Sequence, residues 1–178
     1  MNFVRHYLMD DGTVAGDGFG VFTGKTIVKH MTDADNELQV IKFTREGGKD
    51  VILANWQGHP HRAGQENGKV STKVTADIVG AMRTEMETRL DCYFAYFTGA
   101  SGNVNNNGRI AGETITKDHF EHGKVLADHA IEALENAKMV ETGTVQILKQ
   151  EVQAERKDGS GTTAVQLYAF SIGDVAFV

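Results

Sequence analysis

The 178-residue sequence has a single cysteine, and this scarcity excludes two kinds of stabilisation. One thiol cannot form an intrachain disulfide, and it cannot build a zinc site from cysteine ligands. Cys92 lies in the apolar run CYFAYF, so we expect it to be a small buried side chain and not a reactive thiol.

Basic residues are also too few to support a nucleic-acid interface. Lys and Arg total 18 against 24 Asp and Glu, which gives a net charge of −6. Neutralising a phosphate backbone needs a basic patch or stripe, and the sequence contains none. The composition therefore argues against a nucleic-acid partner.

Long apolar runs are missing as well. No stretch of about 18 apolar residues occurs, which argues against a transmembrane segment. The opening residues MNFVRHYLMD lack the continuous apolar segment of a secretory signal. One unpaired cysteine does not decide the redox compartment, so the cellular location stays open.

Proline occurs once and glycine 20 times, so the expected loops are rich in glycine and asparagine.

The length suits a single domain, predicted over residues 1–178. The apolar patterns predict strands or helices, in chain order, at residues 3–8, 39–44, 51–56, 75–90 (helix), 92–98, 116–137 (helix), 144–156 and 163–171, then a last apolar strand DVAFV. Residues 11–36 are expected to form a long irregular loop with a short strand at 26–29. We therefore predict an α/β fold, with α+β as the alternative: a layered domain with a mostly mixed sheet, two main helices and a C-terminal β-hairpin.

Each predicted helix has a threonine as its expected N-cap, Thr75 for the first and Thr116 for the second. The first helix has an apolar stripe made of Ile78, Val79, Met82, Met86 and Leu90. The second carries His119, His122 and His129 without a metalloprotease signature. We expect these three histidines to lie on a solvated polar face.

The stretch VILANWQGHPH, residues 51–61, places a histidine directly after a predicted strand. Gly58 and Pro60 end the strand, so His59 is expected at its carboxyl end, the edge where α/β folds bind ligands and metals. His59 is therefore a candidate metal ligand, with a hydrogen-bonded structural histidine as the alternative. His61 adds less, because Pro60 disturbs the alternation that would point both rings the same way.

Two further segments carry polar groups near predicted element ends. Asp77 lies in the first turn of the first helix, where a favourable interaction with the helix dipole is the simpler interpretation. The loop FTGASGNVNNN at residues 97–107 contains Gly99, Gly102 and a run of amides after a strand. Such a loop can offer backbone N–H groups to an oxygen or an anion, or it can be a plain flexible turn.

In order along the chain, NWQGHP at 55–60, TADIVGAM at 75–82 and GASGNVNNN at 99–107 resemble motifs of the neutral/alkaline, non-lysosomal ceramidase family. The opening NFVRHYLMDDGT and the close LYAFSIGDVAFV also resemble segments of that family's amino-terminal domain. The resemblance implies a zinc-dependent hydrolase that cleaves the amide bond of N-acyl sphingoid lipids, in a family whose members are often secreted or membrane-associated.

The resemblance also implies roles for particular residues. His59 matches one of the family's zinc-binding histidines. Asp77 and His61 would help to position that ligand without binding the zinc themselves. Gly102, Asn103 and Asn105 would line the side of the substrate carbonyl, and Asn105 stands where the ceramidases have a serine. An amide can donate a hydrogen bond to an oxyanion, but it cannot be activated as a nucleophile.

Three of the four zinc ligands of that family have no counterpart in this sequence. Its second histidine lies in a Thr-His-x-His segment, and its glutamate and tyrosine follow the segment that matches DVAFV. We therefore expect an incomplete portion of a larger hydrolase domain, inactive by itself, with zinc bound in the full-length parent. The alternatives are a non-catalytic binding or scaffold protein that kept the fold, and a related metal hydrolase with a non-ceramide substrate. The apolar edge DVAFV is also expected to allow self-association.

Overall fold

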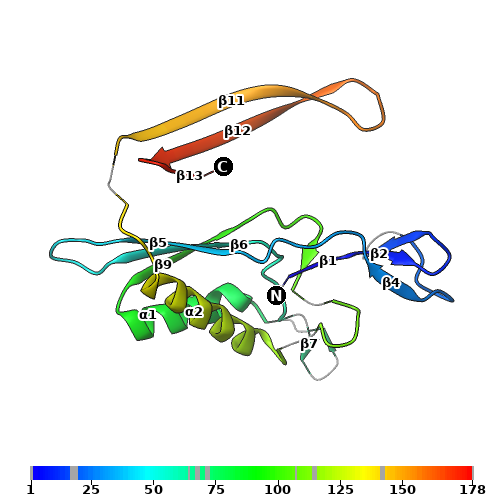
Figure 1. Ribbon diagram of the computed structural model, residues 1–178, viewed down its shortest axis with the longest axis horizontal. Coiled ribbons are helices and arrows are strands. Elements are labelled where there is room, and N and C mark those ends of the chain that lie inside the picture. The colour runs from blue at the N-terminus through cyan, green and yellow to red at the C-terminus, as the bar shows by residue number, and fades with distance from the viewer. Residues whose placement is uncertain are drawn as a thin grey trace. The chain divides into compact units, whose positions relative to one another are not determined.

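The computed structural model describes residues 2–16, 20–63, 65–66, 69–70, 73–106, 108–113, 116–140 and 143–177 (Figure 1). The chain divides into two compact units, Met1–Asn136 and Ala137–Val178. The described part of the first unit contains both strands and helices, and the predicted α/β class is confirmed. The single domain expected over the whole length stays a prediction.

The main sheet of the first unit has the strand order β5-β6-β9. Its strands are β5 (Leu38–Phe43), β6 (Val51–Trp56) and β9 (Tyr93–Thr98). β5 and β6 form the predicted antiparallel hairpin, whereas β6 and β9 are parallel, with Trp56 opposite Thr98. The sheet is therefore mixed, as predicted, and β6 and β9 end at the same edge.

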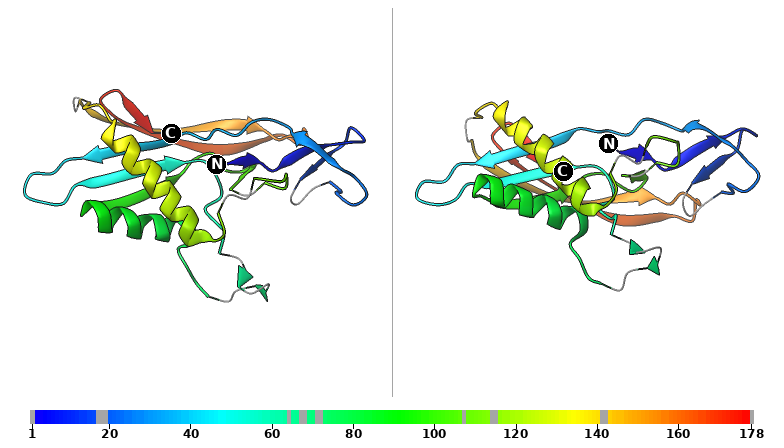
Figure 2. Two further views of the ribbon diagram at one scale, coloured as in Figure 1. Left: turned by 60° about the horizontal axis from the view of Figure 1, so that its bottom comes forward. Right: turned by 90° about the horizontal axis from the view of Figure 1, so that it is seen from below.

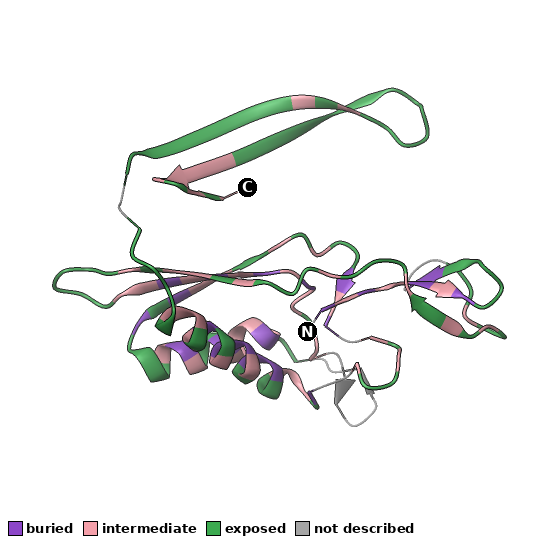
Figure 3. Cartoon of the chain, in the orientation of Figure 1, coloured by how far each residue is buried: buried purple, intermediate pink, exposed green. Residues whose placement is uncertain are grey.

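Two helices, α1 (Asp77–Leu90) and α2 (His119–Glu135), lie on the same face of this sheet (Figures 1 and 2). Alternate residues of β6 are buried, which turns Ile52, Ala54 and Trp56 toward the helices. The buried residues gather where helices and sheet meet (Figure 3). The main core consists of Ile52, Ala54, Trp56, Ile78, Met82, Met86, Cys92, Phe94, Leu126, Ala127 and Ala130.

Both helices begin slightly later than the sequence pattern predicted. The predicted cap Thr75 is wrong for α1, because the helix starts at Asp77 with Ala76 at its N-cap, although Thr75 Oγ1 accepts a hydrogen bond from the backbone N–H of Asp77 at 3.0 Å. The N-cap of α2 is Asp118, whose carboxylate accepts from the backbone N–H of Glu121 at 2.9 Å. The predicted cap Thr116 is wrong, because Asp118 and Glu121 have the spacing of a capping box and satisfy the first turn themselves.

Among the described residues of the first unit, three small sheets accompany the main one. β3 (Val14–Gly16), β2 (His6–Met9) and β4 (Ile27–His30) form one, in that order. β1 (Phe3–Val4) pairs with β10 (Val104–Asn105), and β7 (Gln65–Glu66) pairs with β8 (Lys69–Val70).

The long irregular loop predicted for residues 11–36 is wrong at β3, whereas the short strand predicted within it at 26–29 is confirmed as β4. Residues 17–19 of this segment lie outside the described part of the chain. The strands on either side of β2 bury Tyr7, Met9 and Ala15, with Phe22 and Ile27 packed against them. A few apolar side chains spread among many glycines were enough to build a second small core there.

The second unit is the predicted C-terminal β-hairpin with one further strand. β11 (Val145–Glu155) and β12 (Thr162–Ile172) pair antiparallel along their whole lengths, and β13 (Val175–Phe177) pairs with the end of β12. Gly159 and Gly161 have φ angles of 70° and 121°, so the turn between the long strands needs glycine there.

Candidate functional site

The site lies at the edge where the parallel strands β6 and β9 end. His59 follows β6, and its backbone N–H donates to the carbonyl of Val104 at 3.3 Å. The side-chain amide of Asn106 donates to the carbonyl of His59 at 2.8 Å. The structure therefore brings His59 against the loop after β9, which is the juxtaposition that the sequence motifs predicted.

Gly58 is required where it stands. Its φ angle is 128°, and a Cβ built there would lie 2.6 Å from Oδ1 of the buried Asn2. The amide of Asn2 in turn donates to the carbonyl of Gln57. A side chain at position 58 would therefore displace both the amino-terminal segment and the turn that carries His59.

The His59 imidazole lies beside a second imidazole and is partly shielded from solvent. Its ring centroid lies 5.2 Å from that of His61, with the planes nearly perpendicular at 72°. Burial, together with the charges of His61 and Arg5, lowers the pKa of His59 below its usual value. A neutral imidazole keeps a lone pair that can coordinate a cation or accept a proton.

Arg5 fixes the loop that contains the other candidate residues. Its guanidinium donates to the carbonyl of Gly102 at 2.7 Å, and its backbone N–H donates to the carbonyl of Asn103 at 2.9 Å. Gly102 and Asn103 are exposed, and Asn105 is partly buried in β10 opposite Phe3. Asn107, the last residue of the motif, lies outside the described residues.

Asp77 connects the turn after β6 to the start of α1. Its carboxylate accepts from the backbone N–H groups of Arg62 at 2.9 Å, Ala63 at 2.8 Å and Ile78 at 2.8 Å. Asp77 has a φ angle of 53°, a left-handed conformation that is uncommon outside glycine. Asp77 therefore holds the backbone that directly follows His61, and its supporting role for His59 stays a prediction.

Sequence reasoning missed Arg5 and Asn106. Asn106 is 3 % exposed, although it lies in a run of asparagines that is typical of a solvated turn. Arg5 lies between two short strands, and nothing in its neighbourhood marks it as a loop partner. The available signal was the apolar Val104 inside the polar loop, which indicated that part of the loop would be buried.

The expectation of a solvated face is wrong for His122. This residue is 2 % exposed, with its Nδ1 atom 3.0 Å from Thr116 Oγ1 and its ring centroid 5.7 Å from that of Trp56. His129 is exposed, as expected. The buried row of α2 runs through residues 122, 126 and 130, and such a row of i, i+4 positions winds away from position 129.

We predict that His122 makes the protein less stable in mild acid. Burial, with a contribution from Arg62, lowers its pKa from 6.5 to about 4, so the unfolded chain binds the proton more tightly. Its contribution is therefore complete above about pH 6.5 and is lost as the pH falls toward 4. From pH 7 to pH 4.5, the free energy of unfolding measured in urea should fall by about 2 kcal/mol more in the wild type than in His122→Asn. Equal losses in both proteins would contradict the prediction.

The described side chains near His59 provide too few ligands for a catalytic zinc site. Within the described ranges, no group of three or more His, Cys, Asp or Glu side chains is placed to hold a metal ion. His59 and His61 offer two imidazoles, whereas catalytic zinc sites use about three protein ligands and a water. These residues alone therefore do not fit a catalytic zinc ion, and no reaction step is assigned to one.

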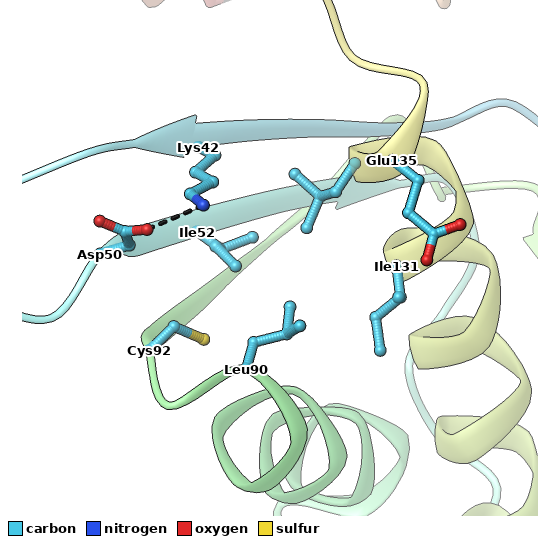
Figure 4. Close-up of a pocket in the computed structure, with 8 residues that line it drawn as sticks. Lys42, Asp50, Ile52, Leu90, Cys92, Ile131 and Glu135 are labelled. Carbon is cyan, nitrogen blue, oxygen red and sulfur yellow. Dashed lines mark ion pairs between the residues drawn. The ribbon is translucent and has the colours of Figure 1, made fainter.

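A cavity of about 220 Å³ lies at the amino ends of β6 and β9, at the opposite end of β6 from His59 (Figure 4). Its wall includes Ile52, Leu90 and Ile131, and the Lys42–Asp50 ion pair of 2.8 Å lies on one side. Cys92 contributes a thiol that is buried, as predicted, and this burial raises its pKa.

No protein-family model matches the chain, and neither the comparison with curated proteins nor that with solved structures gives a match. The resemblance to ceramidases is therefore carried by the motifs of the sequence. No helix in the part of the chain described above is long and apolar enough to cross a membrane.

Proposed function

We propose that this chain is part of a zinc-dependent amidohydrolase that resembles neutral ceramidase and hydrolyses an N-acyl amide bond. The observation that supports the proposal is the contact between the His59 turn and the loop after β9, made through Val104 and Asn106. Motifs more than 40 residues apart in the sequence meet at one edge of the sheet, as a shared site requires.

The residues of this chain would bind and orient the substrate. Asn103 and Asn105 carry amides that can donate hydrogen bonds to a carbonyl oxygen as it gains negative charge. Gly102 keeps the loop free of a side chain at its exposed position, where a Cβ would meet no atom within 4 Å. Neutral His59 would serve as one metal ligand, the remaining ligands coming from outside the described residues, so the chain by itself is expected to be inactive.

We predict weak zinc binding that depends on His59. Two imidazoles supply an incomplete ligand set, so the dissociation constant of the full chain should lie in the micromolar range or above, far weaker than that of a structural zinc site. Titration with Zn²⁺, followed by the NMR signals of the histidine rings, should shift His59 first. His59→Ala should abolish the saturable shift, and the exposed His129→Ala should leave it intact.

Two results of this titration would contradict the proposal. If the His59 ring signals did not respond to Zn²⁺, His59 would not be a ligand. Tight one-to-one binding that is lost in His59→Ala would show that the chain holds a complete site, against the expected incomplete one.

An N-acyl ethanolamine of medium chain length should in addition shift the backbone signals of Gly102, Asn103 and Asn105.

A non-catalytic binding or scaffold protein is the second candidate function, favoured by the incomplete donor set. It predicts that the acyl amide shifts the loop signals while His59→Ala leaves that binding unchanged. A related metal hydrolase with a different amide substrate predicts zinc binding at His59 without any response to the acyl amide. Association through the DVAFV edge, of which Val175–Phe177 form β13, stays a prediction that concerns a different surface.

A further inference from the structure

The second unit presents a long free strand edge. The strand order β11-β12-β13 leaves one side of β11 at the edge of the sheet. All 11 residues of β11 pair with β12 on the other side, and no strand of the described residues pairs with the free side. An exposed edge of this length is a template for another strand.

The hydrogen bonds at the two ends of β11 show which backbone groups point outward. The carbonyl of Thr144 accepts from Gly173 at 3.4 Å, and the N–H of Arg156 donates to Gly161 at 2.9 Å. Bonded residues alternate in an antiparallel ladder, and the register between these ends is continuous. The even-numbered residues therefore bond to β12, and the odd-numbered ones, from Val145 to Glu155, turn their N–H and C=O groups to the free edge.

The free edge of β11 is complementary to itself. Gln150 is the midpoint of Val145–Glu155, so a two-fold axis through it pairs two copies along their whole lengths, odd residues opposite odd. In this register Lys149 lies opposite the partner's Glu151, and the axis repeats that pair. A register centred on Lys149 or Glu151 would instead place like charges opposite each other and shorten the ladder.

The apolar side chains of the sheet support the same register. Leu148, Val165 and Leu167 are 58 %, 37 % and 50 % exposed, and they share one face with Val152, which lies opposite Val165. This exposure is visible along the hairpin in Figure 3. Pairing about Gln150 places Leu148 opposite the partner's Val152, so the apolar patches of two copies join into one.

We propose that two copies of this chain associate through antiparallel pairing of their β11 strands about Gln150. The dimer extends the sheet of the second unit across both copies. Its surface differs from the edge of β13 and from the His59 site, so the proposal is independent of the proposed function.

A charge-swap experiment on the full chain tests the register. Sedimentation equilibrium of the wild type should show a monomer–dimer equilibrium. Lys149→Glu and Glu151→Lys should each weaken the dimer by about tenfold or more, because two attractive pairs become two repulsive ones. The double variant restores opposite charges at both places and should return the dissociation constant to within about threefold of the wild-type value.

The double variant also controls for an intramolecular contact. The Lys149 amine lies 5.3 Å from the centroid of the Tyr168 ring, and both Lys149→Glu and the double variant lose that contact. Recovery in the double variant therefore reports the charges across the interface. A wild type that stays monomeric up to millimolar concentration would overturn the proposal, as would a double variant as weak as the single ones. A loss of association in Ala176→Asp, with both single swaps without effect, would overturn it in favour of β13.

Discussion

Replacing Gly123 by alanine is expected to lower the free energy of unfolding by about 3 kcal/mol, at the upper end of the usual cost of overpacking a core. A Cβ at this position would lie 2.5 Å from Ala81 Cβ, 2.7 Å from Met82 N and 2.8 Å from Ile78 O. Two of these atoms are backbone, so the clash is relieved only if α1 and α2 move apart. Helix propensity favours alanine by about 1 kcal/mol, and the measured loss is what remains after that gain.

Gly102→Ala is the control for Gly123→Ala, and urea unfolding of both variants separates the steric clash in the core from the effect of replacing glycine by alanine. A Cβ at Gly102 meets nothing within 4 Å, so this control should stay within about 0.5 kcal/mol of the wild type. If Gly123→Ala were as stable as the wild type, the close approach of the two helices would be incorrect. The isolated glycine within the apolar pattern of α2 thus has a packing reason.

The elements with strong periodic patterns could be predicted from the sequence. The hairpin of β5 and β6, both helices and the pairing of β11 with β12 follow from apolar spacing and turn residues alone. The strand β3 was harder, because Ala15 is buried in a small core to which Ile110, from a distant part of the chain, contributes. Short strands are decided by such tertiary contacts more than by local propensity.

Part of the candidate site could likewise be predicted from the sequence, and part of it could not. His59 and the loop after β9 could be placed together, because both follow parallel strands that end at one edge. Asn106, Arg5 and the burial of His122 depend on which groups meet after folding. Local spacing carries no information about hydrogen bonds such as that of Arg5 with Gly102, 97 residues away.

Replacing Asp77 by alanine is expected to lower the free energy of unfolding by about 3 kcal/mol, because the N–H groups of Arg62, Ala63 and Ile78 lose their shared acceptor. Alanine also tolerates the φ angle of 53° poorly. The turn that carries His59 should loosen as well, and amide hydrogen exchange at Arg62 and Ala63 should accelerate at least tenfold.

Asp77→Asn is the matched control, since asparagine adopts left-handed backbone readily and keeps one carbonyl oxygen as an acceptor. The free energy of unfolding should fall about half as much in Asp77→Asn as in Asp77→Ala. The amide hydrogen exchange rate at Ala63 should also increase less. Equal losses in the two variants would show that the backbone conformation at position 77, and not the carboxylate, decides stability. Unchanged exchange at Arg62 and Ala63 in Asp77→Ala would separate Asp77 from the His59 turn, and the supporting role proposed for this residue would then be wrong.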